Sequence, residues 1–399
     1  MIFVVPKIQS KFGIVSHMKS MRNSEESITR FEKEFSDRIG RTFSIATFTG
    51  RSALIAILKS IGLKKGDEVL IPGFTFIGIP QIISAMGYSP VLVDVDETLC
   101  IDSSKIEELV SAKSKVLLVV HNLGNPCDMD KITAICNKHN LFLIEDCAHT
   151  ISSKYKGKNV GSFGDVCLFS FHYSKIINTE WGGMACTDNK DLAERIRSNV
   201  NKFKEQTKSM LLKRIVVSFL QSIATSPLAY TFIFRPANKI YKRLSGKDII
   251  DALYSLKPQD LETHQYKFTG YQAELGCEEL RKIDSYNQTR KRLLEVFNKE
   301  IKGKIKLQTQ TKHSDFIPLQ LALFSKGRDQ LIEKLEKKRI EAKKFYISCI
   351  PESDDFSGCR NNCETAKRLN REIIYLPTFM YQSEKTMKYI ADCICEIET

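Results

Sequence analysis

Residues 115–149, KVLLVVHNLGNPCDMDKITAICNKHNLFLIEDCAH, contain the pattern that decides the fold. Two β-rich runs, Lys115–His121 and Leu141–Glu145, flank a segment of helical period over 129–139. Strands that are apolar at successive positions, such as Val116–Val120, are typical of a parallel sheet that is covered on both faces. The stretch therefore predicts a βαβ unit, in which the helix connects two parallel strands.

The same alternation extends from about residue 43 to residue 200. It predicts four more strands, at Glu68–Ile71, Pro90–Asp94, Val166–Phe171 and Gly183–Thr187. It also predicts helices near 52–61, 78–86, 104–111 and 190–199. The fold class is therefore α/β, a large domain with a mainly parallel sheet flanked by helices.

The length of 399 residues exceeds what one hydrophobic core usually organises, which favours a second, smaller domain. Beyond residue 262 we expect helices around 270–300, 328–338, 364–371 and 383–397, with a strand at Phe316–Phe324. This is the size of an α+β C-terminal domain. The predicted division is an N-terminal segment (1–42), the large domain (43–201), an insertion (202–262), a return to the large domain (263–290) and the small domain (291–399).

The insertion is basic at both ends and uncharged from Ile215 to Phe234. Gln221, Pro227 and several hydroxyl residues argue against a transmembrane helix. Apolar residues share one helical face, namely Ile215, Phe219, Leu220 and Ile223. Two interpretations stay open: a surface that contacts anionic lipid through 202–250, or a helix buried against the domain or a partner subunit.

Composition excludes several classes of protein. The net charge of +13 occurs without any nucleic-acid-binding motif, so no nucleic-acid partner is expected. Twelve scattered cysteines indicate reduced thiols, and Cys359 with Cys363 lacks a second ligand pair, so no metal is expected. The apolar run before Lys7 is too short for a signal peptide, which favours the cytoplasm.

Residues at the predicted strand ends have reactive or ligand-binding side chains. Ligands of an open parallel sheet bind at the carboxyl ends of the strands. The candidates there are Asp146 and His149 after one strand, Ser170 and Lys175 after another, and Gly50, Arg51 and Ser52 at the start of the first helix. Each type is common elsewhere, but their recurrence at successive strand ends favours a shared site.

Pyridoxal 5'-phosphate (PLP) would give each of these residues a task. The Lys175 amine could form a Schiff base with the cofactor aldehyde, and Asp146 could keep the pyridine nitrogen protonated. The helix start at Gly50–Ser52, with Ser170, offers N–H and hydroxyl groups to a phosphate. Phe76, which follows another strand, could cover the ring.

At these residues the chain resembles the DegT/DnrJ/EryC1/StrS family of sugar aminotransferases, which are fold-type I PLP enzymes. The block Ile144-Glu-Asp-Cys-Ala-His149 is similar to the family's E-D-x-A-[HQ] motif, and Gly161–Lys175 is similar to its lysine block. His121–Asp130 and Tyr266–Gly276 resemble two further family motifs. The resemblance covers about three quarters of the chain.

The resemblance implies amino transfer, usually from glutamate, to a nucleotide-linked keto-sugar in a homodimer with shared active sites. It assigns Lys175 to the Schiff base, Asp146 to the pyridine nitrogen, and Ser170 with Gly50–Ser52 to the phosphate. Phe76 and His149 would hold the ring. Related sugar dehydratases have histidine in place of the lysine, so Lys175 favours transamination over dehydration.

The chain departs from the family pattern at four places. Where the family usually has S-G-T, this chain has Thr49-Gly-Arg51, which places a cation beside the expected phosphate site. Gln265 stands where the family has an asparagine that reaches the partner's phosphate, and Lys267 stands at the arginine that follows it. Trp181 replaces a glycine of a tight turn, which Glu180 and Gly182-Gly183 would still allow. The long 202–262 insertion could change the substrate, for example to a lipid-linked sugar.

Two alternatives to a keto-sugar aminotransferase stay open. One is a different PLP reaction, such as sugar dehydration. The other is a catalytically silent relative associated with a membrane, which the altered Arg51 and Gln265 and the insertion would fit.

Overall fold

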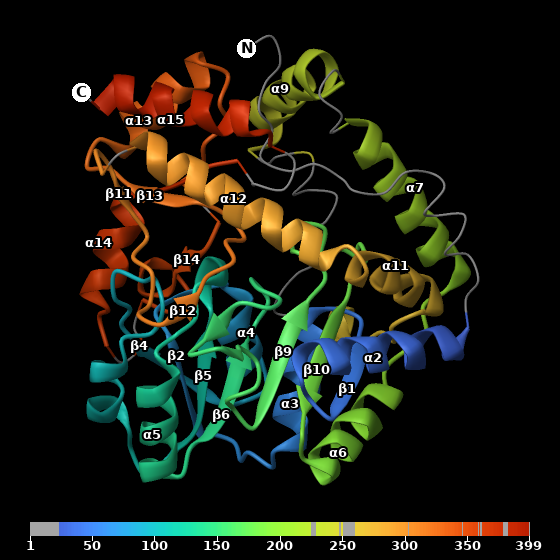
Figure 1. Cartoon of the computed structure of the whole chain (residues 1–399). Helices are drawn as coiled ribbons and strands as arrows, with labels where there is room; N and C mark the ends of the chain where they lie inside the picture. Colours follow the sequence, from blue (N-terminus) through green and yellow to red (C-terminus); the bar gives the residue numbers. More distant parts are fainter. Residues whose placement is uncertain are drawn as a thin grey trace.

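The computed structural model describes residues 24–224, 229–246, 249, 260–301, 303–344, 346–357, 359, 361–377 and 382–398. A seven-stranded sheet forms the centre of the large domain, and helices surround it (Figure 1). Its strands are β1 (Phe43–Thr47), β2 (Glu68–Pro72), β4 (Ser89–Val93), β5 (Ser114–Val120), β6 (Phe142–Asp146), β9 (Val166–Ser170) and β10 (Gly183–Thr187). The predicted α/β fold class is confirmed.

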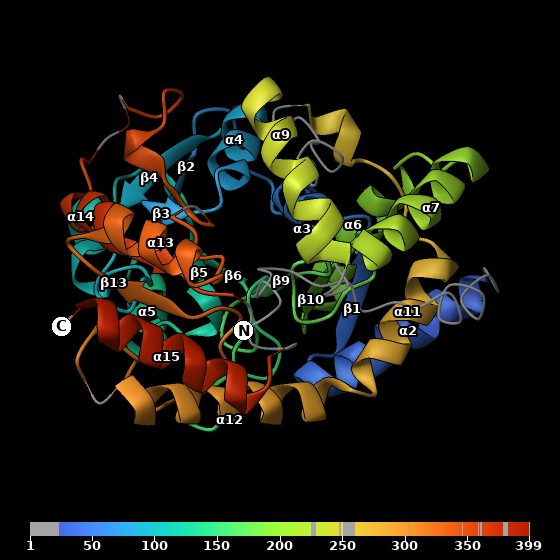
Figure 2. The same cartoon turned by 90° about the horizontal axis from the view of Figure 1, so that it is seen from above.

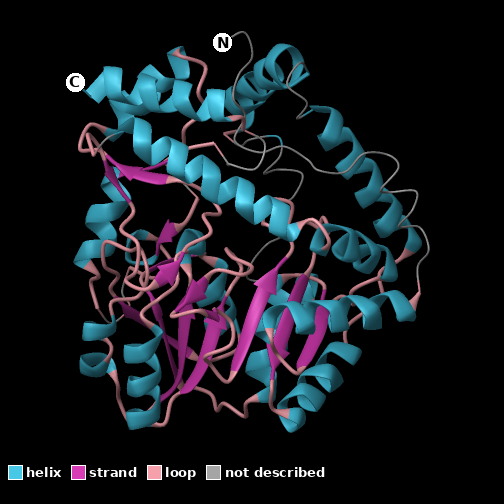
Figure 3. Ribbon diagram, viewed as in Figure 1, coloured by secondary structure: helices cyan, strands magenta, loops and turns pink. Residues whose placement is uncertain are grey.

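The strand order is β1-β10-β9-β6-β5-β2-β4. Neighbouring strands from β9 through β4 run parallel, whereas β10 is antiparallel to both β9 and β1. Figure 3 shows these strands as one layer with helices around it. Because β2, β5, β6 and β9 run the same way, their carboxyl ends meet at one edge of the sheet.

Both faces of this sheet are buried, and β5 illustrates how. Val116, Leu118 and Val120 pack into one core cluster, while Leu117 and Val119 pack into another. Successive side chains of a strand point to opposite faces, so a strand covered on both sides must be apolar throughout.

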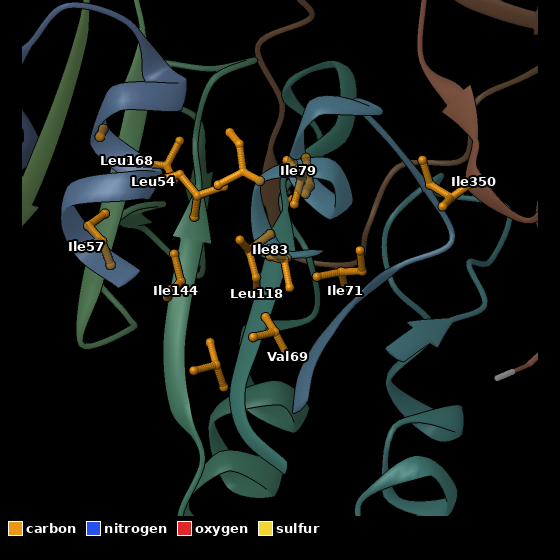
Figure 4. Packing of buried hydrophobic residues seen from close by; sticks show 14 of the residues in the cluster. Leu54, Ile57, Val69, Ile71, Ile79, Ile83, Leu118, Ile144, Leu168 and Ile350 are labelled. Carbon is orange, nitrogen blue, oxygen red and sulfur yellow. The ribbon is translucent and has the colours of Figure 1, made fainter. Parts of the chain in front are cut away.

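The helices of the large domain supply the covering side chains. They are α2 (Glu25–Ile39), α3 (Gly50–Ser60), α4 (Gly78–Ala85), α5 (Met129–His139), α6 (Lys190–Asn201) and α11 (Gly270–Leu280). Figure 4 shows Leu54 and Ile57 of α3 and Ile79 and Ile83 of α4 packed over strand residues such as Leu118. Met129 and Ile132 of α5 pack on the other face, beside Leu117.

The remaining elements belong to the C-terminal part of the chain, and all of them except α14 share a separate core. They are α12 (Ile283–Ile301), β11 (Lys306–Leu307), β13 (Ala322–Phe324), α13 (Arg328–Lys337), α14 (Glu364–Glu372), β15 (Ile373–Tyr375) and α15 (Glu384–Glu398). Buried residues of α12, α13 and α15 form one cluster with those of β13 and β15. Short strands β3 (Phe74–Thr75) and β14 (Ser348–Cys349) pair and connect this part to the large domain.

The predicted insertion contains α7 (Lys208–Ala224), a π-helical turn η4 (Tyr230–Phe234) and α9 (Arg235–Ser245). Seen from above, α7 lies on the side of the molecule opposite α14, and α9 lies between α4 and α7 (Figure 2). No helix among the described residues has both the length and the apolar character needed to cross a bilayer. The predicted apolar run 215–234 is divided between α7 and η4, and residues 225–228 lie outside the described part.

Two predicted elements were wrong. Residues 104–111 form two 3-10 turns, Ser103–Lys105 and Glu107–Leu109, rather than a helix, because the backbone becomes extended at Val110. The strand expected at Phe316–Phe324 is confined to Ala322–Phe324. Pro318 has no N–H to donate to a ladder, and Arg290 instead donates to the carbonyl of Pro318 over 2.9 Å.

Several elements were missing from the prediction, among them helix α2, strand β1 and short strands such as β3, β11, β14 and β15. Helix α2 falls in the segment 1–42, where residues 1–23 lie outside the described part. Strand β1 occupies Phe43–Thr47 and pairs with β10.

Candidate active site

A cavity of about 420 Å³ opens at the carboxyl ends of the parallel strands. Most of its lining comes from the large domain, and Tyr346 and Ile347 add a wall from the C-terminal part of the chain. The predicted site residues on this lining are Gly50, Arg51, Phe76, Asp146, His149, Ser170 and Lys175. The fold thus brings together side chains that lie up to 125 positions apart in the sequence.

Lys175 lies in the loop that follows β9. Its backbone N–H donates to the carbonyl of His172 over 2.8 Å, which fixes a turn directly after the strand. Its Nζ atom lies 5.6 Å from the centroid of the Tyr346 ring. The amine is therefore held inside the cavity against an aromatic face.

Asp146 is the last residue of β6, and its side chain is buried on the cavity wall. Its Oδ1 atom accepts a hydrogen bond from the Ala148 N–H over 2.8 Å. Burial raises the pKa of this carboxyl, while the Ala148 N–H and the charges of Lys175 and His121 oppose that rise. A cation at the cavity side would favour the carboxylate further.

His149 is oriented by the backbone. Its Nδ1 atom accepts a hydrogen bond from the Leu123 N–H over 3.2 Å, so the proton of the neutral ring lies on Nε2. Burial and the nearby Lys175 charge hold the His149 pKa well below its usual value. A neutral, flat ring therefore lines the cavity, 5.7 Å from the Tyr346 ring.

The start of α3 forms the polar end of the cavity. Thr49 caps the helix by accepting from the Ser52 N–H over 3.0 Å. A Cβ atom at Gly50 would lie 3.0 Å from that of Ser170, so only glycine lets this backbone lie so close to the end of β9. Arg51 lies over the Phe76 ring at 5.6 Å, and burial lowers its pKa to about 10, so it stays charged at neutral pH.

Two predicted site residues do not line the cavity. The Ser52 side chain is fully buried, and its hydroxyl donates to the His264 carbonyl. Gln265 lies away from the cavity, where its Oε1 atom accepts from Lys59 over 2.9 Å. The residues at the polar end of the cavity that could bind an anion are therefore Thr49, Gly50, Arg51 and Ser170.

Sequence reasoning missed several lining residues. His172 and Tyr173 follow β9 closely, and their position between Ser170 and Lys175 could have identified them as cavity residues. Burial, with the charges of Lys175 and Arg51, lowers the His172 pKa to about 3. Tyr346 comes from a distant part of the chain, and no local pattern marks it.

Trp181 also lines the cavity, in the turn before β10. The turn forms although tryptophan replaces the family's glycine, because Glu180 adopts a positive φ of 69°. The Trp181 carbonyl accepts from the Thr179 hydroxyl over 2.9 Å and from Gln272. A Cβ atom at Gly183 would lie 2.4 Å from the Thr49 carbonyl carbon, so this glycine allows the turn to meet α3.

The donor set fits PLP. The cavity combines a lysine amine, a buried carboxylate and a neutral imidazole, and a glycine-containing helix start with one serine lies at its polar end. These are the groups that a cofactor with an aldehyde, a pyridine nitrogen and a phosphate requires.

Comparison with known proteins also indicates a PLP-dependent enzyme. The family model described as the DegT/DnrJ/EryC1/StrS aminotransferase family matches residues 8–219 and 246–395. A GDP-perosamine synthase of Escherichia coli O157:H7 is 28% identical over 373 residues, 92% of this chain and 89% of that protein. A GDP-perosamine synthase of Caulobacter vibrioides is 42% identical over 171 residues, 43% of this chain and 46% of that protein.

A solved structure shares the fold. DesV of S. venezuelae, in complex with a ketimine intermediate, has a TM-score of 0.77 at 22% identity, covering 96% of this chain and 93% of that chain. Residues 220–245 fall outside the family match and belong to the insertion. The chain belongs to the DegT/DnrJ/EryC1/StrS family and is a PLP-dependent aminotransferase of the sugar aminotransferase type.

Proposed function

We propose that this enzyme transfers an amino group from glutamate to a keto-sugar linked to a nucleotide. The observation that carries the proposal is the presence of Lys175, Asp146 and His149 on one cavity. A sugar dehydratase of this family would have histidine in place of Lys175. Two relatives named GDP-perosamine synthase support a nucleotide-linked sugar as the substrate.

Each residue has a proposed role in holding the cofactor. Lys175 would hold it covalently, and Asp146 would pair with its pyridine nitrogen. Ser170, the Gly50 N–H and Arg51 bind its phosphate, where Arg51 adds a full charge to the partial charge of the helix end. His149 and Phe76 hold the ring between them.

The chemical step depends on proton transfer by Lys175. PLP, when bound, supplies an electron sink that lets a proton leave the carbon bearing the amino group. The Lys175 amine, which lies in the cavity, would accept this proton and return it. Low water content favours this transfer, and the Tyr346 ring covers one side of the amine.

The absorption spectrum and product analysis test the proposal. Purified enzyme is expected to show a visible cofactor band that glutamate converts to the spectrum of the amino form of the cofactor. Subsequent addition of a nucleotide-linked keto-sugar should restore the band and yield an amino sugar. A dehydrated sugar, or no spectral response to glutamate, would contradict the proposal.

We also propose that two copies pair and that Gln265 of each reaches the phosphate site of the other. Gln265 is half-buried, and it lies in the segment where the family has its partner-directed asparagine. Light scattering should give twice the chain mass. Gln265→Ala should weaken cofactor affinity several-fold, whereas a monomeric protein would exclude the shared site.

A further proposal concerns the surface of the insertion. Between Lys208 and Gly246 the chain has seven lysines and arginines and no acidic residue. Large apolar side chains are exposed on it, namely Leu212, Val216, Leu220, Ile223, Phe232, Ile233, Ile240 and Leu244. Such a surface matches an anionic membrane, which offers negative headgroups above an apolar layer.

Part of the basic charge is already engaged within the protein. Arg235 and Lys239 pair with Glu336, at 3.3 Å and 3.0 Å. Lys208, Lys213 and Arg243 are exposed and remain near the apolar side chains. The apolar contribution to binding should therefore exceed the electrostatic one.

Flotation with anionic vesicles tests this surface. Replacing Leu212, Leu220 and Ile233 together by serine should abolish flotation and leave the cofactor spectrum unchanged. Equal flotation of both proteins would contradict membrane docking. A change in oligomeric state instead would show that a second copy covers this face.

All twelve cysteines are described and none is paired, which supports a reducing compartment such as the cytoplasm.

A further inference from the structure

Helix α7 of the insertion contacts the wall of the active-site cavity through Arg214. The Arg214 guanidinium lies 4.4 Å from the centroid of the Phe48 ring and 5.6 Å from that of Trp181. These two rings are stacked, 6.1 Å apart and 6° from parallel. Arg214 also donates to Gln206, so its plane is held in place over both rings.

Trp181 transmits this contact to the cavity. Its ring meets the edge of His172 at 5.5 Å and 82°, and both residues line the cavity close to Lys175. One turn after Arg214, Ser218 is buried and hydrogen-bonded to Glu180, the residue before Trp181. Helix α7 therefore holds the 180–181 turn at two points.

The other half of the insertion contacts the C-terminal part of the chain, at residues that precede Tyr346 in the sequence. Tyr230 is buried, and its hydroxyl donates to the Glu341 carboxylate. Arg235 and Lys239 pair with Glu336 at the end of α13. Glu341 lies five positions before Tyr346 in the sequence, and the Tyr346 ring faces Lys175.

We propose that the insertion is a structural part of the active-site wall, in which Arg214 positions Trp181 and Tyr230 anchors the segment that leads to Tyr346. Neither residue touches the reacting atoms. Both act by fixing aromatic side chains that shape the space beside Lys175, where an acceptor sugar would lie. This role in acceptor binding rests on the proposed function.

The sequence provides a direct probe of this contact, because Trp181 is the only tryptophan. Its fluorescence therefore reports on the wall alone, with or without substrate. Arg214→Ala admits water beside the indole, so its emission should shift to longer wavelength and acrylamide should quench it more strongly. Lys213→Ala removes the exposed neighbouring cation and serves as the matched control.

Steady-state kinetics give the second measurement. Arg214→Ala should raise the KM for the acceptor on the order of tenfold and change kcat by less than about threefold, because it loosens binding rather than chemistry. Arg214→Lys keeps the charge but not the planar contact, so its KM for the acceptor should lie between those of wild type and Arg214→Ala. Tyr230→Phe should raise KM by a smaller factor, with Tyr241→Phe as its control.

Unchanged emission and quenching in Arg214→Ala, equal to those of Lys213→Ala, would overturn the inference. If Arg214→Ala does not fold, Arg214→Lys gives the same comparison. The emission is read without substrate, so an enzyme that fails to transaminate would contradict the proposed function and leave this test valid. A shift in emission without any rise in KM would overturn the positioning role in acceptor binding.

Discussion

His121 and Glu145 form a fully buried pair, with Nε2 of the histidine 3.2 Å from Oε2 of the glutamate. The Nδ1 atom of His121 accepts the Cys127 N–H over 3.1 Å, so Nε2 carries the proton and donates to Glu145. Both ring nitrogens are thus engaged. Although the Cys147 thiol lies within 4.8 Å, this cluster is satisfied by hydrogen bonds.

Glu145→Gln should destabilise the fold by about 3 kcal/mol, since it removes a charged acceptor of several buried hydrogen bonds. The carboxylate accepts from the N–H groups of Gly161, Phe163 and Gly164 at 2.7–2.8 Å. Urea unfolding measures the difference. Glu107→Gln, at an exposed pair with Lys138, should cost less than about 1 kcal/mol.

The difference in stability between wild type and Glu145→Gln should change with pH in a defined direction. These hydrogen bonds and His121 lower the Glu145 pKa below its usual 4.5, against the effect of burial. The stabilisation is therefore fully present above pH 4.5 and is lost as pH falls through the lowered pKa. A difference between wild type and variant that grew on acidification would contradict this account.

Lys175→Ala should lose the visible cofactor band and lower activity by more than about a thousandfold. The reason is that no other lysine lines the cavity among the described residues. Absorption before and after borohydride reduction measures the loss, and Lys113→Ala, on the exposed surface, serves as control. Retained borohydride-sensitive absorption in Lys175→Ala would assign the cofactor to another amine.

Local pattern predicted the centre of the fold well. Helix α5 has the predicted bounds, and the six strands predicted for the central sheet agree to within one residue, because buried strands and amphipathic crossovers have clear periods. The site residues at strand ends converge for the same reason. Parallel topology alone places Asp146, Ser170 and Lys175 at one edge.

The parts that depend on tertiary contact were not predictable. Tyr346 reaches the cavity because β14 pairs with β3, which joins segments more than 270 residues apart. Ser52 has the right chemistry for a phosphate site, but its hydroxyl is taken by the His264 carbonyl, whose approach the sequence does not reveal. The position of the Arg214 side chain likewise depends on the rings of Phe48 and Trp181, which lie outside helix α7.

Asp146→Asn should lower kcat about 100- to 1000-fold, the range expected when one preorganised charge is removed from a catalytic site. An amide has nearly the same shape and keeps the acceptor for the Ala148 N–H, but it cannot hold a proton on the cofactor nitrogen. Turnover at saturating glutamate measures the change. Asp130→Asn, at an exposed pair with Lys156, is the control, and equal kcat in both variants would exclude the assignment of Asp146.

Glu180→Gln should remove a pH-dependent part of the stability. Burial raises the Glu180 pKa from 4.5 to about 7, while Tyr271, Ser218 and the Arg214 charge oppose the rise. Between these values the unfolded chain is ionised and the folded chain holds a proton, so stability falls as pH rises. Wild type should therefore be about 2.5 kcal/mol more stable at about pH 5 than at about pH 8 through this group alone.

In Glu180→Gln this contribution is absent, because an amide does not titrate. Urea unfolding at the two pH values, compared between wild type and variant, isolates it from all other groups. Tyr271 donates to Glu180 over 2.9 Å and can donate equally to the amide oxygen, so the variant should fold. Parallel pH profiles for the two proteins would show that Glu180 is ionised across the whole range and that Arg214 outweighs the cost of its burial.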